Sequence, residues 1–299
     1  MSVAHPRQTP EQVLDRIDFT VLRRLEGLLQ GDYRTLFRGG GLDFTDLRAY
    51  QPEDDTRHID WNVTARMDAP FVRQFVEDRE LTAWFLLDRS GSMDFGGDPD
   101  KAQTLTDTVV AMARLLTNGG NRIGAVFWDN DVQAVIEPRG GRNQVLRVAQ
   151  QMMLPTTSDV TARPTDLARL GNAALASIRR RSLVFVVSDF VSEPGWERPL
   201  AMLAQRHEVV GMRIVDPAET ELPQAGVMVI EDAETGEQLF VDTSNPGFRQ
   251  RFADAARRRE ETIATVARRS RVDLHSISTD DDVVRSLVTM ATARKKYRP

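Results

Sequence analysis

The chain has 299 residues, a length that accommodates one large α/β domain together with a smaller module. Hydrophobic residues make up 41% and charged residues 28%, proportions that are ordinary for a soluble globular protein. The net charge of -5 gives no general attraction for nucleic acid or for an anionic membrane surface. Because the chain has no cysteine, disulfides, zinc–thiolate sites, iron–sulfur clusters and thiol nucleophiles are all excluded.

The sequence shows no targeting or membrane-spanning segment. Its first residues lack the apolar core of a signal peptide. No apolar run approaches the roughly 18 residues that are needed to cross a bilayer. We therefore expect a cytoplasmic protein with no membrane span.

Taken in chain order, the sequence begins with a predicted helix and continues with alternating strands and helices. Apolar residues recur at helical spacing over residues 14–28, after the start signal Thr9-Pro10. The strands predicted from residue 81 onward are Leu81–Leu87, Ile123–Trp128, Leu183–Ser188, Val209–Val215 and Val272–Ile277. The helices predicted between and after them cover residues 98–118, 145–152, 167–178 and 246–269, with a last helix from residue 280.

This alternation is typical of the α/β class with a doubly wound, mostly parallel sheet of the Rossmann-like kind. Val227–Ile230 and Gln238–Val241 predict a β-hairpin inserted near residues 216–245. We expect two parts, a small N-terminal module over residues 1–79 and the α/β domain over residues 80–299.

The most informative motif is Asp88-Arg-Ser90-Gly-Ser92, directly after the first strand of the predicted sheet. One carboxylate and two hydroxyls around one loop are hard oxygen ligands, which suit Mg²⁺ or Mn²⁺. Ligands of an open α/β sheet bind at the carboxyl ends of its strands. Two further candidates fit that edge, since Asp189 follows Leu183–Ser188 and Thr165 precedes a predicted helix. The alternative is that Thr165 only caps its helix and Asp189 only ends its strand.

With these residues the chain resembles the von Willebrand factor A (vWA) domain and its metal-ion-dependent adhesion site (MIDAS). The resemblance rests on residues 88–93, 164–167 and 188–190, in the expected order. It implies an Mg²⁺ or Mn²⁺ ion whose open position is filled by an Asp or Glu of a partner protein. The implied metal ligands are Asp88, Ser90, Ser92, Thr165 and Asp189. The Gly pair that often precedes the Thr is replaced by Arg163-Pro164.

The segment before this domain, residues 44–66, resembles the signature of the bacterial family called domain of unknown function 58. Further matching segments lie at residues 216–223 and 234–237, while Glu53 stands where the family usually has Gly. The signature residues that we single out are Arg48, Tyr50, Asp54, Arg57, Asp60 and Trp61. The resemblance implies a protein that works with an AAA+ ATPase of the MoxR type in the maturation or remodelling of other proteins.

Two interpretations of the signature segment stay open. In the first it is an ion-paired structural module, in which Phe44, Tyr50 and Trp61 bury against the sheet. In the second it is a surface that binds a partner directly.

The sequence does not contain the complete set of catalytic residues of any enzyme class that we considered. The chain has no Gly-x-x-x-x-Gly-Lys-Ser/Thr loop for ATP, and its four histidines lie in no metal-ligand or triad spacing. We therefore expect a non-enzymatic adaptor protein. A metal-dependent phosphoester hydrolase is the alternative, although the second carboxylate of aspartyl-phosphate phosphatases is missing after Asp88-x-Ser90. A weaker alternative is RNA binding through Arg179–Arg181 and Arg257–Arg259, which otherwise form solvated helix faces.

Overall fold

The structure is a computed structural model that describes residues 9–18, 47–51, 56, 59–67, 69–73, 80–96, 99–155, 165–231 and 238–297. Its contacts divide the chain into two compact units. The smaller unit is Phe37–Leu81, and the larger combines Met1–Leu36 with Thr82–Pro299. The boundary that the sequence indicates between residues 79 and 80 stays a prediction.

The smaller unit is built on one antiparallel strand pair and one short helix. Strand β1 (Leu47–Ala49) pairs with β2 (Phe71–Arg73), and α4 (Trp61–Met67) lies between them in the chain. The backbone N–H of Asp60 donates to the carbonyl of Phe71 at 2.8 Å, and the Asp60 carboxylate accepts from Val63 N at 3.2 Å. These bonds join the start of α4 to the strand pair.

The larger unit is organised around a six-stranded sheet with the strand order β10-β7-β6-β3-β4-β5. The parallel strands are β3 (Thr82–Asp88), β4 (Arg122–Asp129), β6 (Leu183–Ser188), β7 (Glu208–Val215) and β10 (Asp273–Ser278). Strand β5 (Asp131–Arg139) pairs antiparallel with β4 at one edge. The predicted α/β class with a mostly parallel sheet is thus confirmed. The central strands β3 and β6 are apolar on both faces because helices cover both faces.

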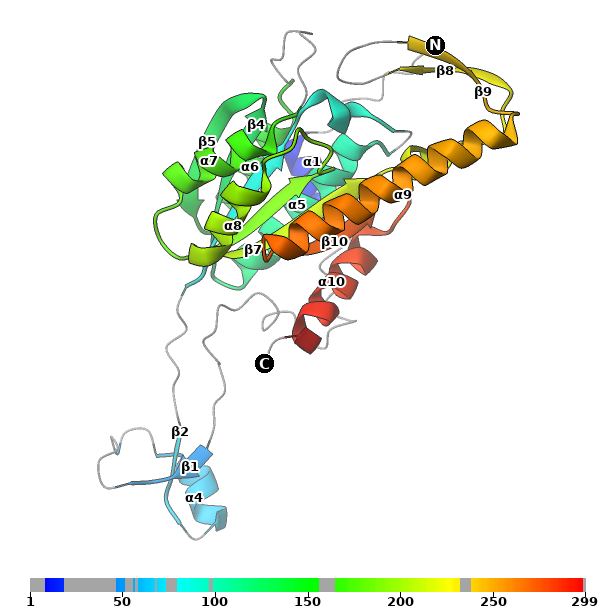
Figure 1. Cartoon of the computed structure of the whole chain (residues 1–299). Helices are drawn as coiled ribbons and strands as arrows, with labels where there is room; N and C mark the ends of the chain where they lie inside the picture. The colour runs from blue at the N-terminus through cyan, green and yellow to red at the C-terminus, as the bar shows by residue number, and fades with distance from the viewer. Residues whose placement is uncertain are drawn as a thin grey trace. The chain divides into compact units, whose positions relative to one another are not determined.

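Helices form a layer on each face of this sheet (Figure 1). The helices α7 (Leu167–Ser177), α8 (Glu197–Arg206) and α9 (Pro246–Arg269) share one buried apolar cluster with β3, β4 and β6. The other face carries α5 (Lys101–Asn118), α6 (Arg142–Met152) and α10 (Val283–Tyr297). Helix α1 (Pro10–Ile17) packs on α5 and α6 through buried Val13, Leu14 and Ile17.

Shorter elements complete the larger unit. The 3-10 turns η3 (Gly91–Asp94) and η4 (Pro217–Glu219) follow β3 and β7. Strands β8 (Val227–Glu231) and β9 (Gln238–Asp242) pair as the antiparallel hairpin that the sequence indicates. Helix α9 spans Pro246–Arg269, as expected.

Several local predictions differ from the structure. Helix α5 is capped by Asp100, whose side chain accepts from Gln103 N at 2.7 Å, and does not begin at Asp98. Strand β5 and helix α8 were not expected. The N-terminal helix ends at Ile17, and residues 19–46 lie outside the described residues. Within the described part of the chain, no helix is both long and apolar enough to cross a membrane.

Candidate metal centre

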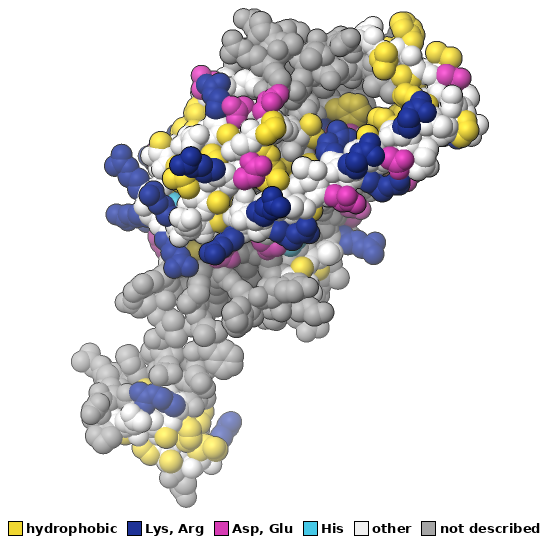
Figure 2. Space-filling model, in the orientation of Figure 1, with side chains coloured by type: hydrophobic (Ala, Val, Ile, Leu, Met, Phe, Trp, Pro, Cys, Tyr) yellow, Lys and Arg dark blue, Asp and Glu magenta, His cyan; other side chains and the backbone are white. Residues whose placement is uncertain are grey.

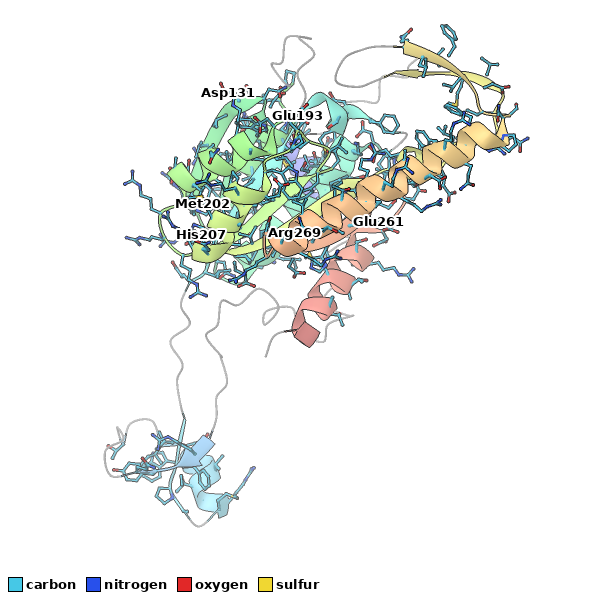
Figure 3. The ribbon with its side chains drawn as sticks, viewed as in Figure 1. Asp131, Glu193, Met202, His207, Glu261 and Arg269 are labelled. Carbon is cyan, nitrogen blue, oxygen red and sulfur yellow. The ribbon has the colours of Figure 1, made fainter. Side chains whose placement is uncertain are left out.

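The candidate site lies where β3 and β6 end side by side. These neighbours run parallel, so the loops after Asp88 and Ser188 leave the sheet at the same edge. Figure 3 shows Asp131 and Glu193, which follow β4 and β6, near this end, while His207 precedes β7 at the opposite end. The edge therefore gathers residues from several loops.

Asp88 is the centre of a buried group of oxygen atoms. Its side chain is 0% exposed. One oxygen, Oδ1, accepts from Ser90 N at 3.0 Å, and the other, Oδ2, accepts from the Ser188 hydroxyl at 2.6 Å. The turn η3 then brings Ser92 back, so that the Ser90 and Ser92 hydroxyl oxygens lie 3.2 Å apart. The loop thus presents one carboxylate and two hydroxyls together.

Asp189 begins the neighbouring loop and is held in a tight backbone turn. Its Oδ1 accepts from Val191 N at 2.9 Å, and its carbonyl accepts from Arg213 Nε at 2.8 Å. Phe190 has a φ of +58°, a left-handed conformation that is uncommon outside glycine. Two contacts hold this conformation. Phe190 N donates a hydrogen bond to the Ser188 hydroxyl at 2.9 Å, and the Phe190 ring packs edge-on against Trp196 with 5.6 Å between the ring centroids.

Thr165 lies at 0% exposure beside the Asp189 loop. Its carbonyl accepts from the Ser192 hydroxyl and from Glu193 N, both at 2.9 Å. The N-cap of α7 is Asp166, whose side chain accepts from Ala168 N at 3.0 Å. The interpretation that Thr165 serves only as the helix cap is therefore wrong, because its neighbour fills that position.

The two carboxylates interact electrostatically. Burial raises the pKa of Asp88 from 3.8 to about 6, and the negative charge of Asp189 contributes to the rise. The hydrogen bonds from Ser188 and Ser90 oppose this rise without cancelling it. Asp88 is thus a buried carboxylate that neutral donors alone do not fully stabilise.

Lys101, which the sequence analysis did not single out, lies at the same edge. It is 1% exposed at the first position of α5, and its Nζ donates to Asp189 Oδ2 at 2.8 Å and to Glu219 Oε1 at 2.5 Å. Burial alone would lower the pKa of Lys101, but Asp189 and Glu219 outweigh burial and raise it. Lysine is almost always exposed to solvent, so nothing in the sequence around Lys101 indicates that it forms a buried ion pair.

Asp129, at the end of β4, is a second residue that sequence reasoning missed. It is 3% exposed, and within the described structure neither carboxylate oxygen has a hydrogen-bond partner. Its charge counteracts the lowering of the pKa of Arg89 by burial. Arg89 directs its own guanidinium to the carbonyls of Gln151 and Leu154 at the end of α6. Asp129 directly follows the apolar strand predicted over Ile123–Trp128, and this position could have identified it from the sequence.

The donor set has the chemistry that a hard divalent cation requires. It combines two carboxylates with three hydroxyls, all buried, from Asp88, Ser90, Ser92, Thr165 and Asp189. The described ranges contain no group of three or more His, Cys, Asp or Glu that could hold a metal. An ion at this edge would therefore depend on hydroxyl oxygens, which suit Mg²⁺ or Mn²⁺ and not softer metals.

The family-signature residues that the structure describes lie in the smaller unit. Arg48 is in β1, Tyr50 N donates to Pro70 O at 2.7 Å, and Asp60 is 8% exposed. Trp61 is 69% exposed as the first residue of α4, and both interpretations of the signature segment stay untested. The signature residues Asp54 and Arg57, and also Phe44, lie outside the described residues.

The two arginine clusters are exposed. Arg179–Arg181 follow α7, and Arg257–Arg259 lie on α9. Figure 2 shows Lys and Arg side chains interspersed with Asp and Glu on the face that carries α9. Mixed signs of this kind are typical of a solvated helix face. RNA binding through these residues stays an untested alternative.

A comparison with protein-family models places the chain. The model described as "Protein of unknown function DUF58" matches residues 46–262. The chain belongs to this family. The DUF58 protein is 35% identical to the uncharacterized protein Rv1480 of Mycobacterium tuberculosis over 290 residues, which cover 95% of this chain and 89% of the relative. It is 30% identical to the uncharacterized protein MAV169 of Mycobacterium avium over 167 residues, 54% of this chain and 94% of the relative.

Two solved bacterial structures resemble the DUF58 protein at low sequence identity. The hypothetical protein BatB from Bacteroides thetaiotaomicron has 13% identity and a TM-score of 0.43, over 71% of this chain and 99% of that chain. An aerotolerance-related membrane protein from Bacteroides fragilis has 12% identity and a TM-score of 0.44, over 72% and 99%.

The description of the second protein as a membrane protein contradicts the cytoplasmic location expected from the sequence. That expectation is corrected, and a cytoplasmic location is not retained. It had relied on the lack of an apolar spanning segment, which says nothing about membrane association through other means.

Proposed function

We propose that this DUF58 protein is a non-enzymatic adaptor with a vWA-like domain that binds partner proteins through a metal-ion-dependent adhesion site. The observation that carries the proposal is the convergence of three loops at the carboxyl edge of β3 and β6. Asp88 accepts from Ser188, the residue before Asp189, and Thr165 is tied through its carbonyl to the loop that follows Asp189. The resemblance in motif order supports the same conclusion.

The residues of this edge supply two kinds of metal ligand, charged carboxylates and neutral hydroxyl oxygens. Asp88 and Asp189 provide negative charge, while Ser90, Ser92 and Thr165 provide neutral oxygens. A bound Mg²⁺ or Mn²⁺ would supply an electron-poor position that a partner's Asp or Glu can fill. Because hydroxyls donate no negative charge, they leave that position attractive to a carboxylate from another protein.

The partner class follows from the family resemblance. We propose that the adaptor works with an AAA+ ATPase of the MoxR type in protein maturation or remodelling. Since the chain itself has no Gly-x-x-x-x-Gly-Lys-Ser/Thr loop, the ATPase would supply the energy and this chain would supply the contact.

The proposal is tested by capturing partners from a native lysate of the source bacterium with the purified full chain. Excess Mg²⁺ is compared with excess EDTA, for wild type, Ser90→Ala and the control Ser177→Ala. Ser177 is exposed at the last position of α7, and its hydroxyl donates to the carbonyl of Ala173 in the same helix. We expect a set of proteins that is captured with Mg²⁺ by wild type and Ser177→Ala and is lost with EDTA or Ser90→Ala. Equal capture in EDTA would contradict the proposal.

A metal-dependent phosphoester hydrolase is the second candidate. The observation that favours it is the raised pKa of Asp88, because perturbed carboxyl groups gather at catalytic sites. Turnover of a generic phosphoester by the purified protein, lost in Asp88→Ala, would replace the adaptor proposal with this one.

A further inference from the structure

Lys101 is an unusual neighbour for a metal site because it brings a positive charge into it. The side chain is 1% exposed, and its ammonium lies between Asp189 and Glu219. The ring of Phe95 adds a third contact, at 5.6 Å from Nζ to the ring centroid. Burying an ammonium group is costly unless it is paired, and these two carboxylates provide the pairing.

Asp189 and Asp88, the two carboxylates of the site, differ in their hydrogen-bond partners. Both oxygens of Asp189 are engaged, Oδ1 by Val191 N and Oδ2 by the Lys101 ammonium. Asp88 accepts hydrogen bonds from two neutral donors, Ser90 N and the Ser188 hydroxyl. Lys101 therefore compensates the charge of Asp189 and leaves Asp88 as the less compensated carboxylate.

We propose that Lys101 is a built-in counter-ion of Asp189 that lowers the affinity of the site for divalent cations, and that Glu219 moderates this effect by sharing the ammonium. This inference rests on the proposed function, because it concerns the same site. A resident cation at 2.8 Å from Asp189 repels an incoming divalent ion and competes with it for the same carboxylate. Glu219 acts in the opposite direction, because its negative charge offsets part of the charge on Lys101.

Two substitutions then have effects of opposite sign on metal affinity. Lys101→Met keeps the length of the side chain and removes its charge, so we expect Mn²⁺ to bind more tightly, on the order of tenfold. Glu219→Gln leaves Lys101 paired with Asp189 alone, so we expect Mn²⁺ to bind more weakly by a similar factor. A purely structural role for the ion pair would instead weaken binding in both variants.

Arg114→Met is the matched control, since it removes one positive charge from the same helix. Arg114 pairs with Asp18 and lies thirteen residues beyond Lys101, which is roughly 20 Å along α5. We expect its Mn²⁺ affinity to equal that of wild type.

The experiment is an Mn²⁺ titration of the purified full chain, with free Mn²⁺ measured by electron paramagnetic resonance and folding checked by circular dichroism. The order Lys101→Met, wild type, Glu219→Gln from tightest to weakest supports the inference. If Lys101→Met does not fold, Lys101→Gln takes its place, because it removes the charge and keeps a donor for the two carboxylates. Tighter Mn²⁺ binding by Lys101→Gln than by wild type then supports the inference, and unchanged or weaker binding overturns it.

The outcomes separate this inference from the proposed function. Mn²⁺ binding by wild type that Lys101→Met leaves unchanged or weakens overturns the inference and leaves the adhesion site standing. Binding by Lys101→Met alone supports the inference and contradicts a metal bridge in the wild-type protein. The absence of binding in both proteins overturns both.

Discussion

At the scale of single residues, the buried carboxyl of Asp88 gives the site a pH dependence with a defined sign. Burial is the main cause that raises the pKa of Asp88 from its ordinary value of 3.8 to about 6 in the folded chain. Without metal, the folded chain therefore binds a proton here more readily than the unfolded chain. The contribution of Asp88 to the free energy of unfolding is fully present below 3.8 and is lost as the pH rises through about 6.

This sign is tested by urea unfolding of wild type and Asp88→Asn in EDTA. Between about pH 4 and about pH 7, we expect the difference in stability to shift toward the variant by up to about 3 kcal/mol, since each pKa unit corresponds to about 1.4 kcal/mol. A difference that does not change with pH would show that folding leaves the pKa of Asp88 unchanged, and a shift toward wild type would show that folding lowers it; either result would contradict the prediction.

The sequence predicts the candidate-site residues that follow strands or precede a helix, and not those that reach the site across the fold. Asp88, Ser90, Ser92 and Asp189 stand directly after apolar strands, so the edge rule for open sheets brings them together. Lys101 and Glu219 meet only because the start of α5 and the turn after β7 pack on the Asp189 loop. Side-chain burial of this kind depends on tertiary packing and has no periodic pattern along the chain.

At the scale of elements, the loop between η3 and α5 depends on a glycine. Gly96 has a φ of +128°, and a Cβ built on it would lie 2.8 Å from Asp216 Oδ2. The same Asp216 oxygen accepts from the Thr279 hydroxyl at 2.8 Å, so it has little freedom to move. Gly96 thus permits the turn after β7 to pack against the loop that leads to Lys101.

We expect Gly96→Ala to lower the free energy of unfolding by roughly 2–3 kcal/mol, because it adds a steric clash to an unfavourable backbone conformation. Gly120→Ala is the matched control, since Gly120 has a φ of +79° and no atom within 4 Å of a built Cβ. Its expected cost is about 1–2 kcal/mol, from the backbone alone. Urea unfolding of both variants measures the difference, and equal costs would contradict the role given to Asp216.

Elements with long apolar runs are predictable, whereas those at the margins of the sheet are not. Strands β3 and β6 are buried along nearly their whole length and stand out as continuous apolar segments. Strand β5 is an edge strand with mostly exposed side chains, and helix α8 carries Pro199 inside a short amphipathic stretch. The sequence therefore did not predict β5 because it lies at the edge of the sheet, and did not predict α8 because its amphipathic stretch is short.

At the scale of the whole molecule, the larger unit combines a buried oxygen-rich edge with an exposed apolar hairpin. Val229 and Phe240 face each other across β8 and β9 and are 44% and 75% exposed. The oxygen-rich edge, by contrast, consists of side chains that the sheet and its loops hold in place. This contrast makes the edge, and not the hairpin, the part of the larger unit whose geometry predicts specific ligand chemistry.

The central claim is that this edge binds a divalent cation, and Mn²⁺ binding to wild type and Ser92→Ala tests it most directly. Wild type and the control Ser177→Ala should bind about one Mn²⁺ per chain, because the buried carboxylates and hydroxyls form a single hard-oxygen site. Ser92→Ala removes one of those hydroxyls and should bind Mn²⁺ at least about tenfold more weakly while remaining folded. No Mn²⁺ binding by folded wild type, or equal binding by Ser92→Ala, would contradict the claim.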